Sequence, residues 1–414
     1  MGPDLVPLLP PSRHPRADQR GHLPDAGRCA VANSQWRCAP SPVSGGAVRR
    51  LLVFGVFLLA AVSAQADDCR WPQWETFAAQ YIDKGRVVDG SDPRQITTSE
   101  GQAYGLFFAL IAGDRARFDQ LLNWTETHLA AGDLSRHLPA WLWGQDADGG
   151  WRVLDQNAAS DADLWMVYAL NEAGRLWREH RYRSKAYWLA KRIVADESRV
   201  VAEHGRLLLP GPEGFVLADG DYRLNPSYVP PQLLQSFAQN YPHSAWPALA
   251  ASSQRWLLAA SPKGFAPDWL RWRDGQILPD PKHGSQGSYD AIRVYLWLGM
   301  MHADAEGRDA LLAGYTPMID AVLAQNAVPE RWNAVSGEYR GRGPFGFKAA
   351  MLPLLKMAEQ ELAASRFAVD VVQAQSESKG RQAYYSQVLS LFGLGWWQGR
   401  YRFDAQGQLT GVCS

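Results

Sequence analysis

The sequence predicts an all-α protein whose helices pair into a closed double ring, an (α/α)6 barrel, and three observations lead to this prediction. Apolar residues recur at helical spacing in twelve segments. Breakers such as Gly113-Asp114 and Pro242 separate neighbouring segments. Acids stand at the starts of the second, fourth and eighth segments, which are all even in the count. In such a ring alternate helices run parallel, so these acids are expected at one mouth of the barrel.

The twelve expected helices form six consecutive pairs. Their ranges are 72–82, 98–111, 115–130, 161–177, 184–198, 228–240, 245–259, 288–302, 307–325, 346–359, 361–374 and 382–398. Short extended pieces are expected in rim loops near 141–154 and 207–215, where Gly and Pro interrupt the pattern.

Length and composition indicate an ordinary globular enzyme-sized chain with one unusual feature. The 414 residues are 46% hydrophobic and 20% charged, which allows a large core. The formal net charge is zero, so nothing points to nucleic acid or an anionic membrane as a partner. The unusual feature is 18 Trp, of which a few on one rim would suffice for a cleft that stacks sugar rings.

The N-terminal region is expected to lie outside the folded domain. Residues 1–47 are rich in Pro, Arg, Gly and Ser and are predicted to be disordered or absent from the natural product. Residues 48–66 have the layout of a secretory signal peptide: Arg49-Arg50, an apolar run from Leu51 to Val62, and Ala64-Gln65-Ala66. The apolar run is short for a membrane span, so a membrane anchor is the less favoured alternative.

A signal peptide normally starts a chain, so its interior position suggests that translation begins near Val43 or Val48. The mature protein is expected to begin at Asp67, to form a single domain over 67–414, and to be periplasmic or secreted without further membrane contact. Of four cysteines, only Cys69 and Cys413 belong to it. In an oxidising compartment they can form a disulfide that joins the chain ends; two free thiols are the alternative.

Each of the three acid-bearing helix starts has a serine that can cap the helix, followed by an acid within two residues. Glu100 follows Ser99, which with Gln102 fits a capping box. Asp161 follows Ser160, and Asp290 follows Ser288 by two residues. Taken singly, such acids are most simply explained by the helix dipole, which favours negative charge at an N-terminus. All three, however, stand at the starts of even-numbered helices and have aromatic neighbours, which favours a catalytic role.

Paired carboxyl groups are what glycoside hydrolysis requires: one protonates the leaving oxygen, and the other activates water or attacks the sugar. A helix N-terminus lowers a carboxyl pKa, whereas a general acid needs a raised one, so Asp161 is a candidate for the neighbouring charge that offsets the dipole at Glu100. Arg293 lies three residues after Asp290 and can keep it ionised; an ordinary surface ion pair is the alternative.

Aromatic residues surround the polar turn 146–150. Trp141, Trp143 and Trp151 are interpreted as stacking platforms on a rim loop, with packing of the loop as an equally good explanation for any one of them. Other chemistries find little support, because the sequence has no H-E-x-x-H, no G-x-S-x-G, no phosphate loop and no dinucleotide fingerprint. No metal or organic cofactor is expected.

These residues carry a resemblance to glycoside hydrolase family 8, within it to the periplasmic endo-β-1,4-glucanases of bacterial cellulose-synthesis systems. The matching segments are Ile96-Thr97-Thr98-Ser99-Glu100-Gly101-Gln102, Leu138-Pro139-Ala140-Trp141-Leu142-Trp143-Gly144, Ala159-Ser160-Asp161-Ala162-Asp163, Asn225-Pro226-Ser227-Tyr228 and Ser288-Tyr289-Asp290-Ala291-Ile292-Arg293-Val294-Tyr295. The two terminal cysteines of the mature chain also resemble that subgroup, whereas residues 1–48 depart from the family pattern.

The resemblance implies the (α/α)6 barrel and an inverting attack on β-1,4-glucan, with Glu100 as general acid and Asp290 as the base. Asp161 would bind and distort the sugar at the cleavage point, and Arg293 and Tyr228 would orient Asp290 and the water. Further candidate substrate-binding residues are Trp141, Trp143, Tyr104 and one tyrosine of the Tyr384-Tyr385 pair, either Tyr385 or Tyr384. Inversion requires the two carboxyl groups to stand roughly 6.5–9.5 Å apart, which leaves room for the water.

Two alternatives remain open. The chain could be a non-catalytic cellulose-binding component of the synthase machinery, although the intact pair of Glu100 and Asp290 favours an enzyme. It could also hydrolyse another β-1,4 polysaccharide, xylan or chitosan. The expected partner is a cellulose chain, with subunits of a cellulose synthase complex as candidate protein partners.

Overall fold

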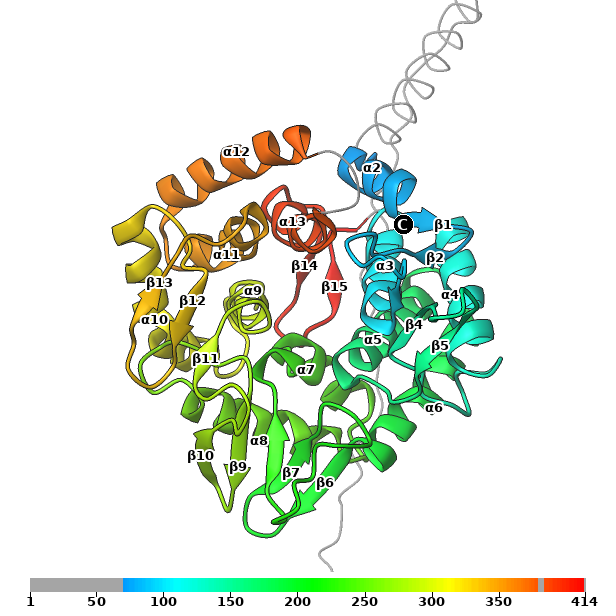
Figure 1. The fold of residues 1–414 in the computed structure, drawn as a ribbon, viewed down its shortest axis with the longest axis horizontal. Coiled ribbons are helices and arrows are strands. Elements are labelled where there is room, and N and C mark those ends of the chain that lie inside the picture. Colours follow the sequence, from blue (N-terminus) through cyan, green and yellow to red (C-terminus); the bar gives the residue numbers. More distant parts are fainter. Residues whose placement is uncertain (1–69, 379–382, 413–414) are drawn as a thin grey trace, which may run out of the picture. The chain divides into compact units, whose positions relative to one another are not determined.

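The computed structural model describes residues 70–378 and 383–412, and the helices of this part of the chain form two concentric layers (Figure 1). The inner layer holds α3 (Ser99–Ile111), α5 (Ser160–Leu176), α7 (Pro231–Asn240), α9 (Ile292–Gly299), α11 (Phe345–Met357) and α13 (Tyr384–Trp397). The outer layer holds α2 (Pro72–Tyr81), α4 (Arg115–Leu129), α6 (His180–Asp196), α8 (Trp246–Ala259), α10 (Arg308–Gln325) and α12 (Glu361–Glu377). The predicted (α/α)6 barrel is confirmed.

The burial of each helix follows its layer. In the inner helix α3 every residue from Gly101 to Ile111 is buried, as expected of a helix that is apolar on all sides. The outer helix α4 buries only a stripe that includes Phe118, Leu121 and Leu129. The ring closes where Phe107 of α3 stacks on Phe392 of α13, with ring centroids 5.5 Å apart.

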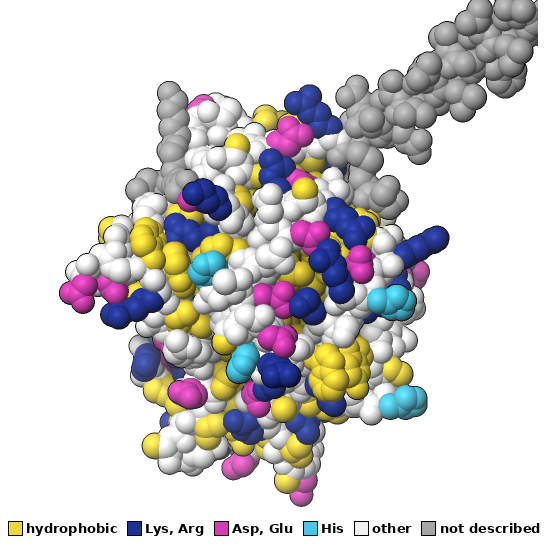
Figure 2. Space-filling model, turned by 90° about the vertical axis from the view of Figure 1, so that its right-hand side faces the viewer, with side chains coloured by type: hydrophobic (Ala, Val, Ile, Leu, Met, Phe, Trp, Pro, Cys, Tyr) yellow, Lys and Arg dark blue, Asp and Glu magenta, His cyan; other side chains and the backbone are white. Residues whose placement is uncertain are grey.

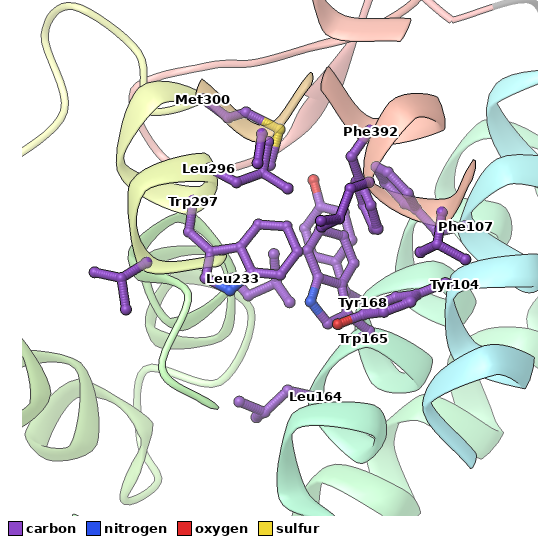
Figure 3. Packing of buried hydrophobic residues seen from close by; sticks show 14 of the residues in the cluster. Tyr104, Phe107, Leu164, Trp165, Tyr168, Leu233, Leu296, Trp297, Met300 and Phe392 are labelled. Carbon is purple, nitrogen blue, oxygen red and sulfur yellow. The ribbon is translucent and has the colours of Figure 1, made fainter. Parts of the chain in front are cut away.

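Large aromatic side chains fill the centre of the ring (Figure 3). Trp165 of α5 lies 4.7 Å from Phe107 and 5.1 Å from Trp297 of α9, measured between ring centroids. Trp297 also donates a hydrogen bond of 2.9 Å from Nε1 to the backbone oxygen of Ser227. Burying a side chain of this size contributes roughly 2–3 kcal/mol, so this core fixes the inner helices relative to one another.

Short antiparallel strands lie in the connections between the helices and after the last helix. They are β1 (Ile82–Asp83), β2 (Arg86–Val87), β3 (Thr97–Thr98), β4 (Leu142–Gln145), β5 (Trp151–Asp155), β6 (Ser198–Val201), β7 (Gly205–Leu208), β8 (Tyr222–Leu224), β9 (Leu270–Arg273), β10 (Gln276–Pro279), β11 (Gln286–Gly287), β12 (Arg331–Asn333), β13 (Tyr339–Arg340), β14 (Arg402–Phe403) and β15 (Leu409–Thr410). Their sheets are β1-β2, β3-β4-β5, β6-β7, β10-β9-β8, β11-β12-β13 and β14-β15.

All sheets except β14-β15 lie in connections that run from an outer helix to the next inner helix, so they surround the mouth where the inner helices begin. The extended piece expected near 141–154 is confirmed as β4 and β5. The piece expected near 207–215 is wrong for most of its length, because β7 ends at Leu208 after pairing with β6. The remaining strands were not anticipated, because two to five residues give too little alternation to read.

The opposite end of the ring is closed by the C-terminal hairpin β14-β15, which runs inside the inner layer in Figure 1. Tyr168 of α5 donates a hydrogen bond of 2.8 Å to the backbone oxygen of Gly407 in the hairpin turn. Glu172 accepts the N–H of Leu409 at 3.1 Å and pairs with Arg175. This end of the barrel is therefore sealed by the chain itself.

The predicted serine caps are wrong at all three helix starts. Thr98 caps α3 by accepting the N–H of Gly101 at 3.0 Å, and Gln102 binds the backbone of Val87 and Gly85 instead of completing a capping box. Ser160 is itself the first residue of α5, and no side chain caps that helix. Ser288 donates to the backbone oxygen of Glu330. A short polar side chain binds whichever backbone group the tertiary fold brings nearest.

Three helix starts differ from the prediction by three or four residues. Helix α9 begins at Ile292, so Asp290 lies in the turn before it and not in its first turn. Helix α7 begins at Pro231, and Tyr228 belongs to the preceding 3-10 turn η1 (Pro226–Tyr228). Helix α6 begins at His180, four residues before the expected start.

The predictions for 1–47, for the signal peptide 48–66 and for Cys69 and Cys413 lie outside the described residues. Within 70–378 and 383–412 there is no helix with both the length and the apolar character needed to cross a bilayer. Figure 2 shows one side of the molecule, where acidic and basic side chains are interspersed, in keeping with a formal net charge of zero.

Candidate active site

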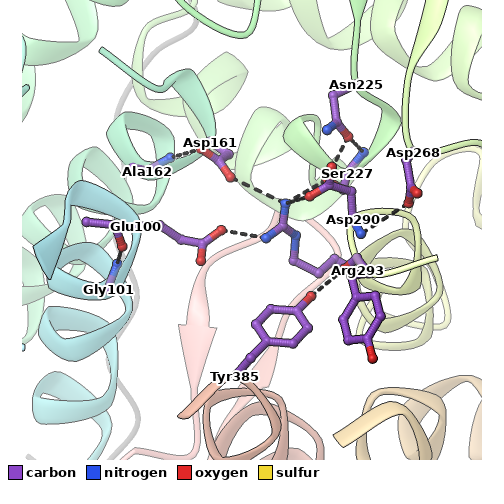
Figure 4. A network of polar contacts seen from close by, with 12 residues as sticks. Glu100, Gly101, Asp161, Ala162, Asn225, Ser227, Asp268, Asp290, Arg293 and Tyr385 are labelled. Carbon is purple, nitrogen blue, oxygen red and sulfur yellow. Dashed lines mark hydrogen bonds and ion pairs between the residues drawn. The ribbon is translucent and has the colours of Figure 1, made fainter. Parts of the chain in front are cut away.

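One arginine, Arg293 of α9, gathers the three acids that the sequence singled out (Figure 4). Its Nη1 donates to Glu100 Oε2 at 2.5 Å, and its Nη2 donates to Asp290 Oδ1 at 3.2 Å. Asp161 Oδ2 lies 3.7 Å from the same Nη2, and Ser227 Oγ accepts from it at 3.0 Å. The guanidinium, with donors fixed in a plane, is the side chain suited to bridging several carboxylates.

The fold explains why residues distant in sequence meet here. Glu100 and Asp161 occupy the first turns of α3 and α5, two inner helices that begin at the same mouth. Asp290 and Arg293 flank the start of α9, a third inner helix. Ser227 is oriented by Asn225, whose Oδ1 accepts its hydroxyl at 2.8 Å and its N–H at 3.0 Å. The prediction that the three acids share one mouth is confirmed.

Exposure divides the cluster in two. The side chains of Arg293 and Asp161 are only 5% and 4% exposed, whereas those of Glu100 and Asp290 are 24% and 34% exposed. The two partly exposed carboxylates can therefore touch a ligand at the mouth. The buried pair beneath them is available to hold the site together and to set its charge.

The cluster contains more acid than base. Burial, followed by the charge of Glu100, raises the pKa of Asp161 to about 8, while Arg293 acts in the opposite direction. The carboxylates in turn raise the pKa of Arg293, which stays charged. With three carboxyl groups around one guanidinium, the group retains a proton at neutral pH, and this proton belongs to the cluster as a whole.

A second pair of acids lies next to Asp161. Asp163 of α5 and Glu197, the C-cap of α6, are completely buried and lie close enough for each to affect the pKa of the other. Burial raises the pKa of both carboxyl groups well above the ordinary range, and each also feels the charge of Asp161. Such a pair avoids the cost of two buried charges only by keeping its carboxyl groups protonated.

The turn that carries Asp290 depends on residues that sequence reasoning missed. Asp268 Oδ1 accepts the backbone N–H of Ser288 at 2.8 Å, of Asp290 at 3.1 Å and of Ala291 at 2.8 Å. Tyr385 donates its hydroxyl to the backbone oxygen of Tyr289 at 2.6 Å. The structure thus selects Tyr385 from the tyrosine pair for a place beside Asp290, whereas Tyr384 packs on Phe77 and Tyr81.

The other predicted tyrosines differ in how they relate to the cluster. Tyr228 lies under the guanidinium of Arg293, 6.0 Å from ring centroid to Cζ, and next to Trp269, which was not anticipated. Arg223 covers the ring of Trp269 at 4.0 Å. Tyr104 is only 2% exposed; burial, followed by the charge of Glu100, raises the pKa of its hydroxyl.

The rim tryptophans are placed by the sheet β3-β4-β5. Trp141 is partly exposed, and its backbone oxygen accepts the N–H of Ser99, one residue before Glu100. Trp143 stacks on Trp151 at 5.0 Å and meets the edge of Trp124 at 5.3 Å, so it packs the rim hairpin against α4. Trp151 keeps 49% of its surface exposed.

In the described parts of the chain, no group of three or more His, Cys, Asp or Glu side chains has the arrangement of a metal site.

A double ring of helices with carboxylates of unequal exposure at one mouth defines the class: a hydrolase of glycosidic bonds. Comparison with known proteins gives the family. Residues 48–399 match the model of glycosyl hydrolases family 8, and the chain belongs to this family.

Individual relatives agree. An endoglucanase of Salmonella typhi is 47% identical over 86% of this chain and 94% of its own length, and one of Escherichia coli K12 is 45% identical over 87% and 96%. The crystal structure of an endo-1,4-D-glucanase from Vibrio fischeri ES114 superposes with a TM-score of 0.80 at 46% identity, covering 82% of this chain and 99% of that chain. Family 8 xylanase structures at 16–17% identity share the fold.

Proposed function

We propose that this chain is an endo-β-1,4-glucanase that hydrolyses internal bonds of cellulose with inversion, with Glu100 as general acid and Asp290 as the base that activates water. The observation that carries the proposal is the bridging of these two exposed carboxylates by one buried arginine. The relatives at 45–47% identity are named endoglucanases, and the Vibrio fischeri structure at 46% identity is an endo-1,4-D-glucanase, which supports a 1,4-linked glucan as the substrate.

Because the cluster has more carboxyl groups than positive charges, it retains the proton that the general acid must deliver. In the free enzyme Glu100 accepts a hydrogen bond from Arg293 at 2.5 Å. Asp161, whose pKa is raised to about 8, holds a proton beside the same guanidinium at neutral pH. When a sugar ring enters and excludes water, the proton retained by the cluster moves to Glu100 and from there to the leaving oxygen.

Asp290 is suited to the second role. Its carboxylate is the most exposed of the three, so a water molecule can reach it. Its hydrogen bond of 3.2 Å with Arg293 fixes the position of the carboxylate, as a base requires. Asp161, Tyr228 and Arg293 would bind and orient the sugar and the water from below, and Trp141 would line the cleft above Glu100. The predicted separation of roughly 6.5–9.5 Å between the catalytic carboxyl groups stays part of this proposal.

The test is the release of reducing ends from soluble carboxymethyl-cellulose by wild type and by Glu100→Gln. We expect the variant to stay folded and to bind the glucan, but to lose activity by about 100- to 10,000-fold. An inactive wild type that still binds glucan would instead favour the binding component. Xylan and chitosan, assayed in parallel, would reveal a different β-1,4 substrate by a higher kcat/KM.

We also propose that the protein is exported, on the strength of the Arg49-Arg50, Leu51–Val62 and Ala64-Gln65-Ala66 pattern, and that it acts alongside cellulose synthesis, as the resemblance implies. Fractionation of expressing cells, with N-terminal sequencing of the recovered protein, tests the export. A mature N-terminus at Asp67 in the periplasmic or extracellular fraction is the expected result, and a cytoplasmic protein that keeps residues 48–66 would contradict it.

A further inference from the structure

We propose that Asp268, in the loop between α8 and β9, is a positioning residue for the reaction: its carboxylate holds the turn that carries Asp290. This inference rests on the proposed function, because it assigns a task to Asp268 only if Asp290 is the base. Asp268 is 22 residues from Asp290 in sequence and would not itself touch the substrate.

The hydrogen bonds define the task. A single oxygen, Asp268 Oδ1, accepts three backbone N–H groups from Ser288, Asp290 and Ala291, at 2.8, 3.1 and 2.8 Å (Figure 4 shows Asp268 beside Asp290). These donors belong to the turn that precedes α9, which begins at Ile292. The first N–H groups of the helix itself bond to backbone oxygens of the same turn, from Ile292 to Ser288 at 3.0 Å and from Arg293 to Asp290 at 3.1 Å. Asp268 therefore binds the N–H groups that the turn leaves over, and holds it from another loop.

Two further contacts hold the same turn from other sides. Tyr385 donates its hydroxyl to the backbone oxygen of Tyr289 at 2.6 Å, and Ser288 donates its hydroxyl to the backbone oxygen of Glu330 at 2.7 Å. Both are bonds between neutral groups. Asp268 contributes the charge-assisted bonds, which are roughly twice as strong. It is thus the contact whose change should move Asp290 most.

Asp268 also titrates in a range that an assay can reach. Burial, followed by the charge of Asp290, raises its pKa to about 6, against the lowering effect of its three N–H partners. The titratable groups that face it are Asp290 from the turn, Tyr295 from α9 and Tyr385 from α13. Above about pH 6 the turn is held by a carboxylate; below it, by a neutral acid that accepts hydrogen bonds more weakly.

Asp268→Asn tests this directly, because the amide keeps one oxygen acceptor and nearly the same shape but never carries the charge. At pH 8 we expect kcat on carboxymethyl-cellulose to fall by about 10-fold with little change in KM, since a small displacement of the base slows chemistry more than binding. As the pH is lowered through 6, wild type acquires a neutral Asp268, so the ratio of wild-type to variant kcat should fall toward one. Asp268→Ala, which removes the acceptor, should lose about 100-fold.

Asp404→Asn is the matched control. Asp404 Oδ1 accepts the N–H of Gln406 at 2.9 Å and of Gln408 at 2.8 Å in the hairpin at the closed end of the barrel. This control should lower thermal stability while leaving kcat and its pH profile unchanged.

Three results would overturn the inference: wild-type kcat in both Asp268 variants, a loss confined to KM, or a kcat ratio that does not vary with pH. Each of these leaves the proposed function intact, provided that wild type cleaves the polymer. A wild type that does not cleave overturns the proposed function and this inference together.

Discussion

The two ends of the barrel use the same kinds of residue, carboxylates and arginine, for opposite purposes. At the closed end Glu172 meets Arg175 one to one, and the carboxylate also accepts the N–H of Leu409. At the open mouth one guanidinium, Arg293, faces Glu100, Asp161 and Asp290. The closed end pairs its buried carboxylate with an arginine of its own and is sealed by a hairpin. The mouth keeps an excess of acid and leaves two carboxylates exposed.

This difference separates stability from chemistry. A balanced buried pair satisfies its own groups and has nothing left for a ligand. An unbalanced cluster pushes a carboxyl pKa upward, as the value of about 8 for Asp161 shows, and retains a proton that a substrate can receive. Substitutions at the two ends should therefore produce different combinations of lost stability and lost activity.

The largest effect is expected for Arg293→Met. Removing the guanidinium leaves three carboxylates without their counter-charge, which should cost about 3–5 kcal/mol in the free energy of unfolding, in line with the loss of one partner of a buried ion pair. Activity should fall by at least about 100-fold, because the bridge between acid and base is lost. Urea unfolding and reducing-end release measure the two effects.

Arg293→Lys separates charge from geometry at the same position. A single ammonium restores a positive charge but cannot bridge Glu100 and Asp290 through two nitrogens. We expect it to recover much of the stability and little of the activity. Full recovery of kcat would show that the bridge is unnecessary.

A smaller effect, confined to stability, is expected for Arg175→Met at the closed end. It leaves Glu172 with the N–H of Leu409 but without its ion-pair partner. The cost should be about 1–3 kcal/mol, because Arg175 is one-third exposed and water screens part of its charge. The kcat of the folded variant should equal that of wild type. A loss of kcat at constant stability would mean that the two ends are coupled.

Glu197→Gln should change how stability depends on pH. The carboxyl groups of Asp163 and Glu197 have raised pKa values in the folded state, so the stability of their neutral form is fully present at acidic pH and is lost as pH rises above the ordinary carboxyl range. Each such group makes the unfolding free energy fall by about 1.4 kcal/mol per pH unit in that window.

The variant lacks one of these titrations, so its stability should decline less steeply than that of wild type as the pH rises above the ordinary carboxyl range. Urea midpoints across this range measure the slope. Glu361→Gln, on the surface of α12 with 56% of its side chain exposed, is the control and should run parallel to wild type. Parallel curves for Glu197→Gln itself would show that the buried pair does not hold a proton.

The smallest effect is expected for Trp151→Ala on the rim. This side chain is 49% exposed and stacks on Trp143, so it can support a glucan chain beyond the carboxylates. The KM for carboxymethyl-cellulose should rise by about 3- to 10-fold with kcat unchanged, as expected when uniform binding is lost. Trp188→Ala on α6 is matched in residue type and exposure, at 46%, and should leave both constants unchanged. Equal KM values in the two variants would assign Trp151 to packing.

Sequence reasoning reached the parts of this molecule that repeat. The helical spacing of apolar residues gave all twelve described helices, and the parity of Glu100, Asp161 and Asp290 placed them at one mouth. It did not predict tertiary contacts that occur at a single place in the fold and follow no repeating pattern. Asp268 resembles any turn aspartate, and only the fold brings it to N–H groups at least 20 residues away. The caps failed for the same reason, since a serine's partner depends on its tertiary neighbours.

The most direct test of the central claim is the configuration of the sugar released when the enzyme cuts a soluble cello-oligosaccharide. A base and an acid that cleave the β-bond in one displacement through a bound water produce the α-anomer at the new reducing end. Proton NMR in the first minutes, before mutarotation, should show the α-anomer ahead of the β-anomer. The β-anomer appearing first would mean retention, and would contradict the assignment of Asp290 as a base acting through water.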